Sequence, residues 1–295
     1  TRPKVGPDRD MRSETCNPTE TCKCNPTETK NNQEYEKSGK PRPAMKLPTL
    51  LSAAVLALST GLPSAHAGDI HSLSANVALQ SDYRFRGISQ TSEDPAISGG
   101  LDYRYNPVGL YVGVWASSIE FNGCGAPCTD AASLEMDVYG GFSGELANGL
   151  GWDIGGIYYL YPSQNEEGTS EFDYGEIYGG LSYTLAGLSL EPTLGASVAY
   201  SPEFFGETGD AVYVNASLDL SLPHGFSLGA ELGWQDVDDA SDYVHWRVGL
   251  GYEWKGLGFD LSYHDAQNDC AAVGGSATLC DDTVIFTVSA SMELW

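Results

Sequence analysis

The chain contains the stretch LSANVALQSDYRFRGISQ at residues 73–90. From Leu73 to Phe85 the odd positions are mostly apolar and the even positions are mostly polar or charged. Because successive strand side chains point to opposite faces, this alternation predicts one long β-strand over residues 73–90. Strands of soluble proteins average about 5 to 6 residues, whereas a strand that crosses a bilayer needs about 9 to 11. The stretch has the length of a membrane-spanning strand.

Eleven further segments with the same alternation follow. They cover residues 97–106, 110–121, 134–145, 150–161, 174–185, 188–200, 211–222, 226–235, 242–254, 257–265 and 283–295. The strands of a soluble β-sandwich also alternate apolar and polar residues, so the lengths of the connections must distinguish a sandwich from a transmembrane barrel. Turns after even-numbered segments are short, as at residues 106–109, whereas connections after odd-numbered segments are longer and acidic, as at residues 162–173. This asymmetry predicts an all-β, antiparallel up-and-down transmembrane barrel of about twelve strands in an outer membrane.

The part of the chain before the barrel divides into two segments. Residues 45–67, MKLPTLLSAAVLALSTGLPSAHA, combine a lysine, a short apolar run and an Ala65-His66-Ala67 cleavage site. They predict a secretory signal peptide, with Sec-type export and cleavage before Gly68. Residues 1–44 are polar and repeat CNPTET, so we interpret them as a disordered upstream extension from a wrongly assigned start. The barrel is then residues 68–295, in the outer membrane of a Gram-negative bacterium.

The sequence is strongly acidic, with a formal net charge of −25 at pH 7. Residues 68–295 hold 33 of the 40 Asp and Glu residues but only five of the 15 Lys and Arg residues. A surface of this kind repels the phosphate backbone, which excludes nucleic acid as a partner.

Many charges fall on the strand positions that face the barrel interior. These predicted pore-lining residues are Asp82, Arg84, Arg86, Asp102, Arg104, Glu135, Asp137, Asp153, Glu176, Glu231, Arg247 and Asp260. An arginine facing hydrocarbon at mid-depth would cost about 2 to 4 kcal/mol, so such charges must face water or one another. If the loop between their strands is centred on Asp239, Glu231 and Arg247 lie directly opposite each other and form a favourable pair.

Three functions fit this interior. The first is a small porin that passes small solutes or ions and prefers cations mildly, because carboxylates line it. The second is a barrel plugged by its own paired charges, with a structural or loop-displaying role. The third is a barrel hydrolase with its site at the rim, but the candidate histidines His71, His224, His245 and His264 stand in no recognisable nucleophile motif. We therefore do not expect an enzyme.

The cysteines of the barrel form two local sets, Cys124 with Cys128 and Cys270 with Cys280. Export to an oxidising compartment predicts disulfides that staple the loops, with local pairing the simplest of three connectivities. Acidic loop residues such as Glu166 and Glu167 could hold a divalent cation, but the twelve-residue calcium-loop motif is missing, so no cofactor is expected.

The run SDYRFRGISQ, Ser81 to Gln90, followed by Asp94-Pro95-Ala96, resembles the opening of the TorF-type porin family of proteobacteria. The resemblance implies an outer-membrane β-barrel and says little about the substrate. For an outer-membrane barrel we expect outer-membrane lipid, lipopolysaccharide and the barrel assembly machinery as partners, together with small solutes or ions.

Overall fold

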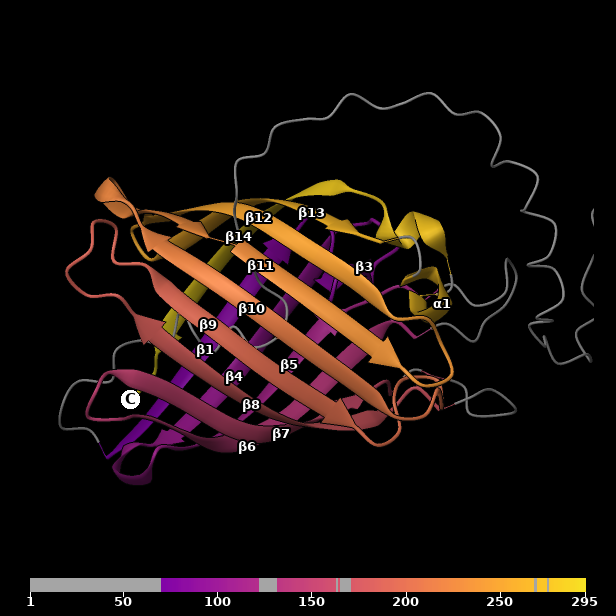
Figure 1. Ribbon diagram of the computed structural model, residues 1–295, viewed down its shortest axis with the longest axis horizontal. Coiled ribbons are helices and arrows are strands. Elements are labelled where there is room, and N and C mark those ends of the chain that lie inside the picture. Colours follow the sequence, from indigo (N-terminus) through magenta and orange to yellow (C-terminus); the bar gives the residue numbers. More distant parts are fainter. Residues whose placement is uncertain (1–69, 122–131, 163, 165–170, 268–269, 275) are drawn as a thin grey trace, which may run out of the picture.

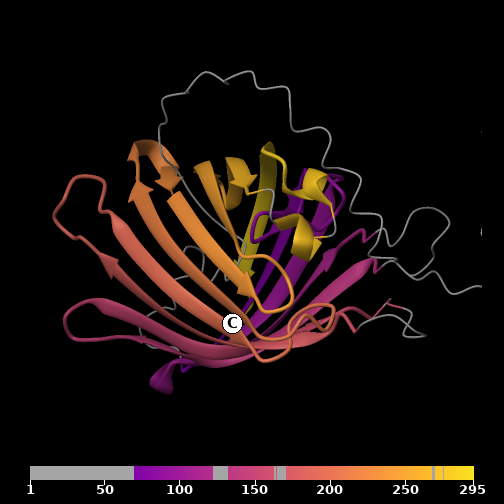
Figure 2. The same cartoon turned by 45° about the vertical axis from the view of Figure 1, so that its right-hand side comes forward.

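The computed structural model describes residues 70–121, 132–162, 164, 171–267, 270–274 and 276–295. Twelve strands form a closed antiparallel barrel (Figure 1). They are β1 (His71–Gln80), β4 (Ala96–Tyr105), β5 (Leu110–Ser118), β6 (Leu134–Glu145), β7 (Leu150–Leu160), β8 (Tyr174–Thr184), β9 (Thr193–Ser201), β10 (Ala211–Ser221), β11 (Phe226–Val237), β12 (Tyr243–Trp254), β13 (Leu257–Ala266) and β14 (Thr283–Glu293). Each strand pairs with its neighbours in the chain, and β1 also pairs with β14, so the first strand lies beside the last (Figure 2). The predicted fold class is confirmed.

The outer face of the barrel is apolar all the way round. Each barrel strand carries at least one large apolar side chain that is exposed: Val77, Ile97, Val112, Val138, Ile154, Ile177, Leu194, Val214, Leu232, Leu250, Leu261 and Phe286. Soluble monomers rarely expose a continuous apolar surface of this kind, whereas a transmembrane barrel carries one as its lipid-facing band. Among the described residues, no helix is long and apolar enough to cross a membrane.

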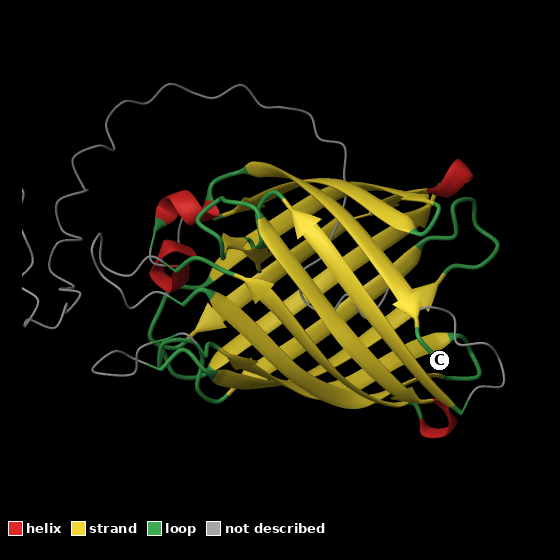
Figure 3. Cartoon of the chain, turned by 180° about the vertical axis from the view of Figure 1, so that it is seen from behind, coloured by secondary structure: helices red, strands yellow, loops and turns green. Residues whose placement is uncertain are grey.

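The two ends of the barrel differ (Figure 3). At the turn end, neighbouring strands are joined by short connections that include the 3-10 turns η2 (Asn106–Val108) and η3 (Pro223–Gly225). At the loop end lie the longer connections, with the short helix α1 (Ala271–Gly274) and the 3-10 turn η5 (Ala277–Cys280). β1 begins at the turn end and β14 finishes there.

Most predicted segments agree with the strands to within three residues, but β9 does not. We predicted a strand over residues 188–200, whereas β9 begins only at Thr193. Leu190 and Glu191 have φ values of 70° and 41°, in the left-handed region that breaks a strand. Pro192 follows them and has no N–H to donate to a ladder.

The prediction of one strand over residues 73–90 is also wrong. β1 ends at Gln80, and the chain then turns inward to form a small hairpin of β2 (Arg84–Phe85) and β3 (Ile88–Ser89). The two residues between them, Arg86 and Gly87, have φ values of 48° and 85°, as a two-residue hairpin turn of type I′ requires. The alternation from Leu73 to Gln80 therefore belongs to β1, and its last part, up to Phe85, belongs to the hairpin segment inside the barrel.

Candidate functional site

The tip of the β2–β3 hairpin is anchored inside the barrel by Arg86. Its Nη1 and Nη2 atoms donate to the two carboxylate oxygens of Glu176 in β8, at 2.8 and 2.7 Å. Nη1 also donates to the side-chain oxygen of Gln235 in β11, at 2.7 Å. The guanidinium lies over the ring of Tyr213 in β10, 4.1 Å from its centroid. Paired hydrogen bonds and a cation–π contact fix both the position and the plane of this side chain.

One flank of the hairpin packs against β5, β6 and β7. The Tyr83 hydroxyl donates to Glu135 at 2.9 Å, and the Tyr83 ring meets Trp115 edge to face. Phe85 meets Tyr159 in the same way. Burial, together with the negative charge of Glu135, raises the pKa of Tyr83, so its hydroxyl keeps its proton and remains a donor.

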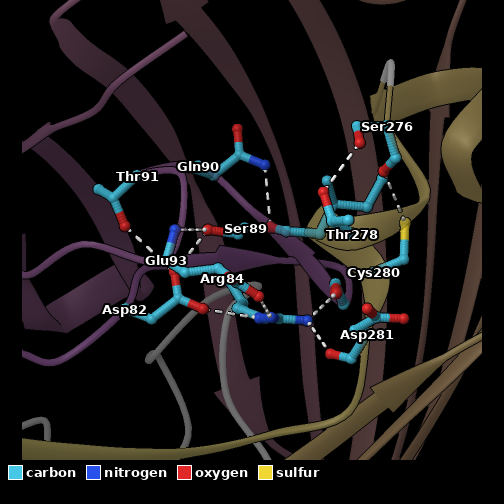
Figure 4. A network of polar contacts seen from close by, with 12 residues as sticks. Asp82, Arg84, Ser89, Gln90, Thr91, Glu93, Ser276, Thr278, Cys280 and Asp281 are labelled. Carbon is cyan, nitrogen blue, oxygen red and sulfur yellow. Dashed lines mark hydrogen bonds and ion pairs between the residues drawn. The ribbon is translucent and has the colours of Figure 1, made fainter. Parts of the chain in front are cut away.

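The other flank is a polar network that joins the hairpin to the loop before β14 (Figure 4). Arg84 donates from Nε to Asp82 at 2.8 Å and from Nη1 to the backbone oxygen of Asp281 at 2.8 Å. The hydroxyls of Ser89 and Thr91 both donate to the second carboxylate oxygen of Asp82. The network thus holds the two strands of the hairpin together and joins them to Asp281, which comes 197 residues after Arg84 in the sequence.

A disulfide between Cys270 and Cys280 closes that loop. Both sulfur-bearing residues are fully buried and pack with Ile88 of the hairpin and with Tyr243 and Ala266 of the wall. The disulfide prediction is confirmed for this pair. Cys124 and Cys128 lie outside the described residues.

Aromatic side chains cover the same end of the barrel. Phe121, Tyr161, Phe172 and Phe205 form a cluster in which every pair of ring centroids lies within about 6 Å. The cluster joins the core that contains Tyr83, Phe85 and Tyr159. Such packing supplies apolar contact and rigidity at the loop end.

The hairpin therefore touches most of the wall. Its residues contact Trp115 of β5, Glu135 of β6, Tyr159 of β7, Glu176 of β8, Tyr213 of β10, Gln235 of β11, His245 of β12 and Ala266 of β13. Asp82, Tyr83, Arg84 and every residue from Arg86 to Thr91 are buried. The hairpin fills the interior at the loop end.

The turn-end half of the interior is different, because water reaches its charged groups. Arg104 and Asp153 are only partly buried. Arg104 donates to Ser143 at 3.0 Å, and Asp153 accepts from the Tyr111 hydroxyl at 2.8 Å. Asp102 accepts from the Tyr139 hydroxyl. These contacts cross between strands and leave a polar, hydrated lining at this end.

Inward-facing glycines make room for the tyrosines of this lining. A Cβ atom on Gly113 would collide with the ring of Tyr139, and one on Gly155 would collide with the hydroxyl end of Tyr178. Glycine is therefore required where a tyrosine lies flat across the neighbouring strand.

Arg247 lies between the loop-end half and the turn-end half of the barrel interior. The strand register places it directly opposite Glu231, as predicted. Arg247 nevertheless forms an ion pair with Asp260 of β13, whose Oδ1 lies 2.7 Å from Nη2. Glu231 accepts hydrogen bonds from Tyr213 and Asn215.

The twelve predicted pore-lining residues fall into two groups by burial, and their pore-lining role stays a prediction. Asp82, Arg84 and Arg86 are on the hairpin and not on a strand, which corrects the prediction that they line a strand face. With Glu135, Asp137, Glu176, Glu231 and Arg247 they are buried, whereas Asp102, Arg104, Asp153 and Asp260 are partly exposed. Sequence reasoning missed Tyr213, Gln235 and the anchoring role of the hairpin. The alternation in their strands predicts that Tyr213 and Gln235 face the barrel interior, but it does not predict that both contact Arg86.

A barrel hydrolase would need a serine next to a histidine base. The described barrel has one serine–histidine hydrogen bond, between Ser262 Oγ and His264 Nε2 at 3.1 Å. Ser262 is 1% exposed, and its hydroxyl donates to Asp260 at 2.7 Å. A nucleophile must instead donate to its base and face the substrate, so this geometry does not favour hydrolysis. Within the described ranges, no group of three or more His, Cys, Asp or Glu side chains could hold a metal ion. The predicted loop cation falls partly on residues 165–170, outside those ranges.

Comparison with known proteins gives a family and a set of similar folds. Residues 64–292 match the model of a family described as "Bacterial protein of unknown function (Gcw_chp)". The comparison with curated proteins finds no match. Solved structures of similar fold include a KdgM porin (10% identity, 75% of this chain and 97% of that chain, TM-score 0.45) and a NanC porin (10%, 75% and 100%, TM-score 0.47). LpxR from Salmonella typhimurium is similar to the same degree (11%, 74% and 99%, TM-score 0.44). At these scores the likenesses carry no functional argument, and the TorF-type resemblance stays a prediction.

Proposed function

The chain belongs to the Gcw_chp family, whose description assigns no activity, and we propose from its barrel interior that it is an outer-membrane channel closed by its own hairpin. In this proposal β2 and β3 are the plug of the loop-end mouth, and the turn-end half is a hydrated vestibule. Small solutes or ions pass when the hairpin leaves its place.

The observation that carries the proposal is the way in which the hairpin is held. Its contacts reach eight of the barrel strands, and most of them are side-chain contacts. Among the described residues, its backbone is joined to the wall through β1, through β4 and by the hydrogen bond from the Glu120 N–H to the Gln90 carbonyl at 2.8 Å. A segment of this kind can move without unpairing any wall strand, because its ladder is internal, from Arg84–Ser89 to Phe85–Ile88. Plugs of this design suit a channel that must stay closed until it is triggered.

The lining supports a mild preference for cations. Asp102, Asp153 and Asp260 are partly exposed to the vestibule, against Arg104 as the partly exposed arginine among the described strands. Carboxylates that line a narrow aqueous path concentrate cations and repel anions. With twelve strands, the lumen is narrower than that of general porins of about 16 to 18 strands, so we expect small solutes only.

Single-channel recording in planar bilayers tests the proposal. The protein is compared with a variant in which residues 82–91 are replaced by a glycine–serine linker of equal length. We expect rare or small openings in the unmodified protein and frequent, discrete conductance steps in the variant, with a reversal potential in a potassium chloride gradient that indicates cation preference. A matched control carries the same type of linker at residues 186–191, at the turn end.

A permanently plugged barrel is the second candidate, and the bidentate, fully buried pair of Arg86 and Glu176 favours it. A folded linker variant that conducts no better than the unmodified protein would select this candidate. Equal and frequent conductance in both proteins would instead contradict the plug.

A further inference from the structure

A small cavity lies between the hairpin and the wall. It is lined by Arg84, Arg86 and Gly87 of the hairpin and by Glu231, His245, Arg247 and His264 of the wall. Three of the four arginines of residues 68–295 therefore meet at one place, although they come from two separate parts of the chain. The cavity has room for about one water-sized sphere.

The three arginines leave four buried nitrogen atoms without a hydrogen-bond acceptor. These atoms are Arg84 Nη2, Arg86 Nε, Arg247 Nε and Arg247 Nη1. The side chains of Arg84 and Arg86 are each 1% exposed, and that of Arg247 is 10% exposed. Arg84 Nη2 also has an ion-pair contact with Glu93 Oε1 at 3.7 Å, which is longer than a hydrogen bond. Buried polar groups are almost always satisfied, so buried donors without hydrogen bonds on three residues that line one cavity point to an acceptor that occupies it.

The other edges of the guanidinium groups are already engaged. Asp82, Glu176 and Asp260 accept from Arg84, Arg86 and Arg247 in that order, and none of these three carboxylates lines the cavity. Glu231 does line it, but its Oε1 atom accepts from Tyr213 and Asn215.

The composition of the lining selects the kind of occupant. Arginine has donors and no acceptor, so a species that only accepts hydrogen bonds matches three guanidinium groups better than water, which must also donate. A phosphate or a carboxylate-bearing metabolite is too large for a space of this size. A single-atom anion fits.

We propose that the cavity among Arg84, Arg86 and Arg247 is a binding site for one small monovalent anion of halide size. The anion bridges the hairpin to β12, because two of its arginine partners are on the hairpin and the third is on the wall. A ligand that binds only when both parts are in place stabilises the arrangement that brings them together. Anion binding is therefore coupled to the seating of the hairpin, and it does not depend on whether the barrel conducts.

Crystals of the detergent-purified protein grown in sodium bromide test the site directly. We expect an anomalous bromide peak within hydrogen-bonding distance of Arg84 Nη2, Arg86 Nε and an unpaired nitrogen of Arg247. The absence of an anomalous peak in the cavity, with bromide only at the protein surface or water in its place, would overturn the proposal.

Thermal unfolding gives a second test in solution. The chloride concentration is varied at constant ionic strength with gluconate, an anion too large for the cavity. We expect the midpoint to rise with chloride in the unmodified protein and in Arg104→Gln, which removes an arginine from the other half of the lumen, but not in Arg247→Gln. The same chloride dependence in both variants, or none in the unmodified protein, would count against the site. If Arg247→Gln does not fold, the bromide map decides alone.

Discussion

Arg86 and Glu176 stand 90 residues apart in the sequence, and their side chains meet through two parallel hydrogen bonds inside the barrel. Both side chains are almost completely buried, at 1% and 2% exposure. Neither could remain there alone, because an unpaired buried charge is strongly unfavourable. The pair therefore decides whether the hairpin sits in the barrel or outside it.

Replacing Arg86 by alanine leaves Glu176 buried without a partner. Loss of one member of a buried ion pair costs about 3 to 5 kcal/mol, so we expect the hairpin to leave the barrel before the wall unfolds. Denaturant unfolding in detergent should show an added early transition. Arg104→Ala is the control, since Arg104 is partly exposed and bonds to Ser143. An identical single transition in the two variants would show that the ion pair does not hold the hairpin.

Gly87 should be as sensitive as Arg86. Its φ of 85° disfavours any other residue, and a Cβ atom there would lie 2.6 Å from the Cβ of His245. We expect Gly87→Ala to release the hairpin and to make the bonds after Arg84 and Arg86 accessible to trypsin, which cannot reach them in the unmodified protein. Gly187→Ala is matched, with φ of 91° but open space around it, and should stay resistant. Resistance of both variants would refute the close packing of the tip.

The disulfide should stabilise the loop that supports the hairpin. Cys270 and Cys280 are 10 residues apart, and a disulfide that closes a loop of this size contributes about 2 to 3 kcal/mol. We expect the Cys270→Ser, Cys280→Ser double variant to lose about that much unfolding free energy and to gain trypsin cleavage after Arg84, whose Nη1 bonds to Asp281. Unchanged stability together with unchanged cleavage would mean that the loop holds its shape without the bond.

Arg247 should influence ion selectivity once the hairpin is absent. Its removal leaves Asp260 without its ion-pair partner and takes one positive charge from the lumen, so the path becomes more negative. In the linker variant, we expect Arg247→Ala to move the reversal potential toward greater cation preference. Lys255→Ala removes the same charge from an exposed turn and should have no effect. An unmoved reversal potential in Arg247→Ala would place this residue off the conduction path.

The wall could be predicted from the sequence because lipid on one side and polar groups on the other impose a strict two-residue period. The same period gave the register of Glu231 opposite Arg247, since a tight loop between two known strands leaves little freedom. The local disulfide of Cys270 and Cys280 was predictable from their short spacing together with the expected export to an oxidising compartment.

The interior of the loop end was not predictable in the same way. The two-residue period that begins in β1 continues as far as Phe85 in β2, and only the pair Arg86-Gly87 marks the turn of the hairpin. Arginine is uncommon at a left-handed position, so the signal was weak. The partners Glu176 and Gln235 are joined by tertiary contacts that no local pattern encodes.

The seam between β1 and β14 gives the hairpin a place in the order of assembly. The hairpin follows directly after β1, while its supporting loop directly precedes β14, and the seven residue pairs of the seam join these two strands. Until the last strand has arrived, neither Asp281 nor the disulfide is there to receive Arg84 and Ile88. We therefore expect the hairpin to close the lumen in the same step in which β1 pairs with β14 and the barrel closes. A newly inserted molecule would then not let ions cross the membrane during its assembly.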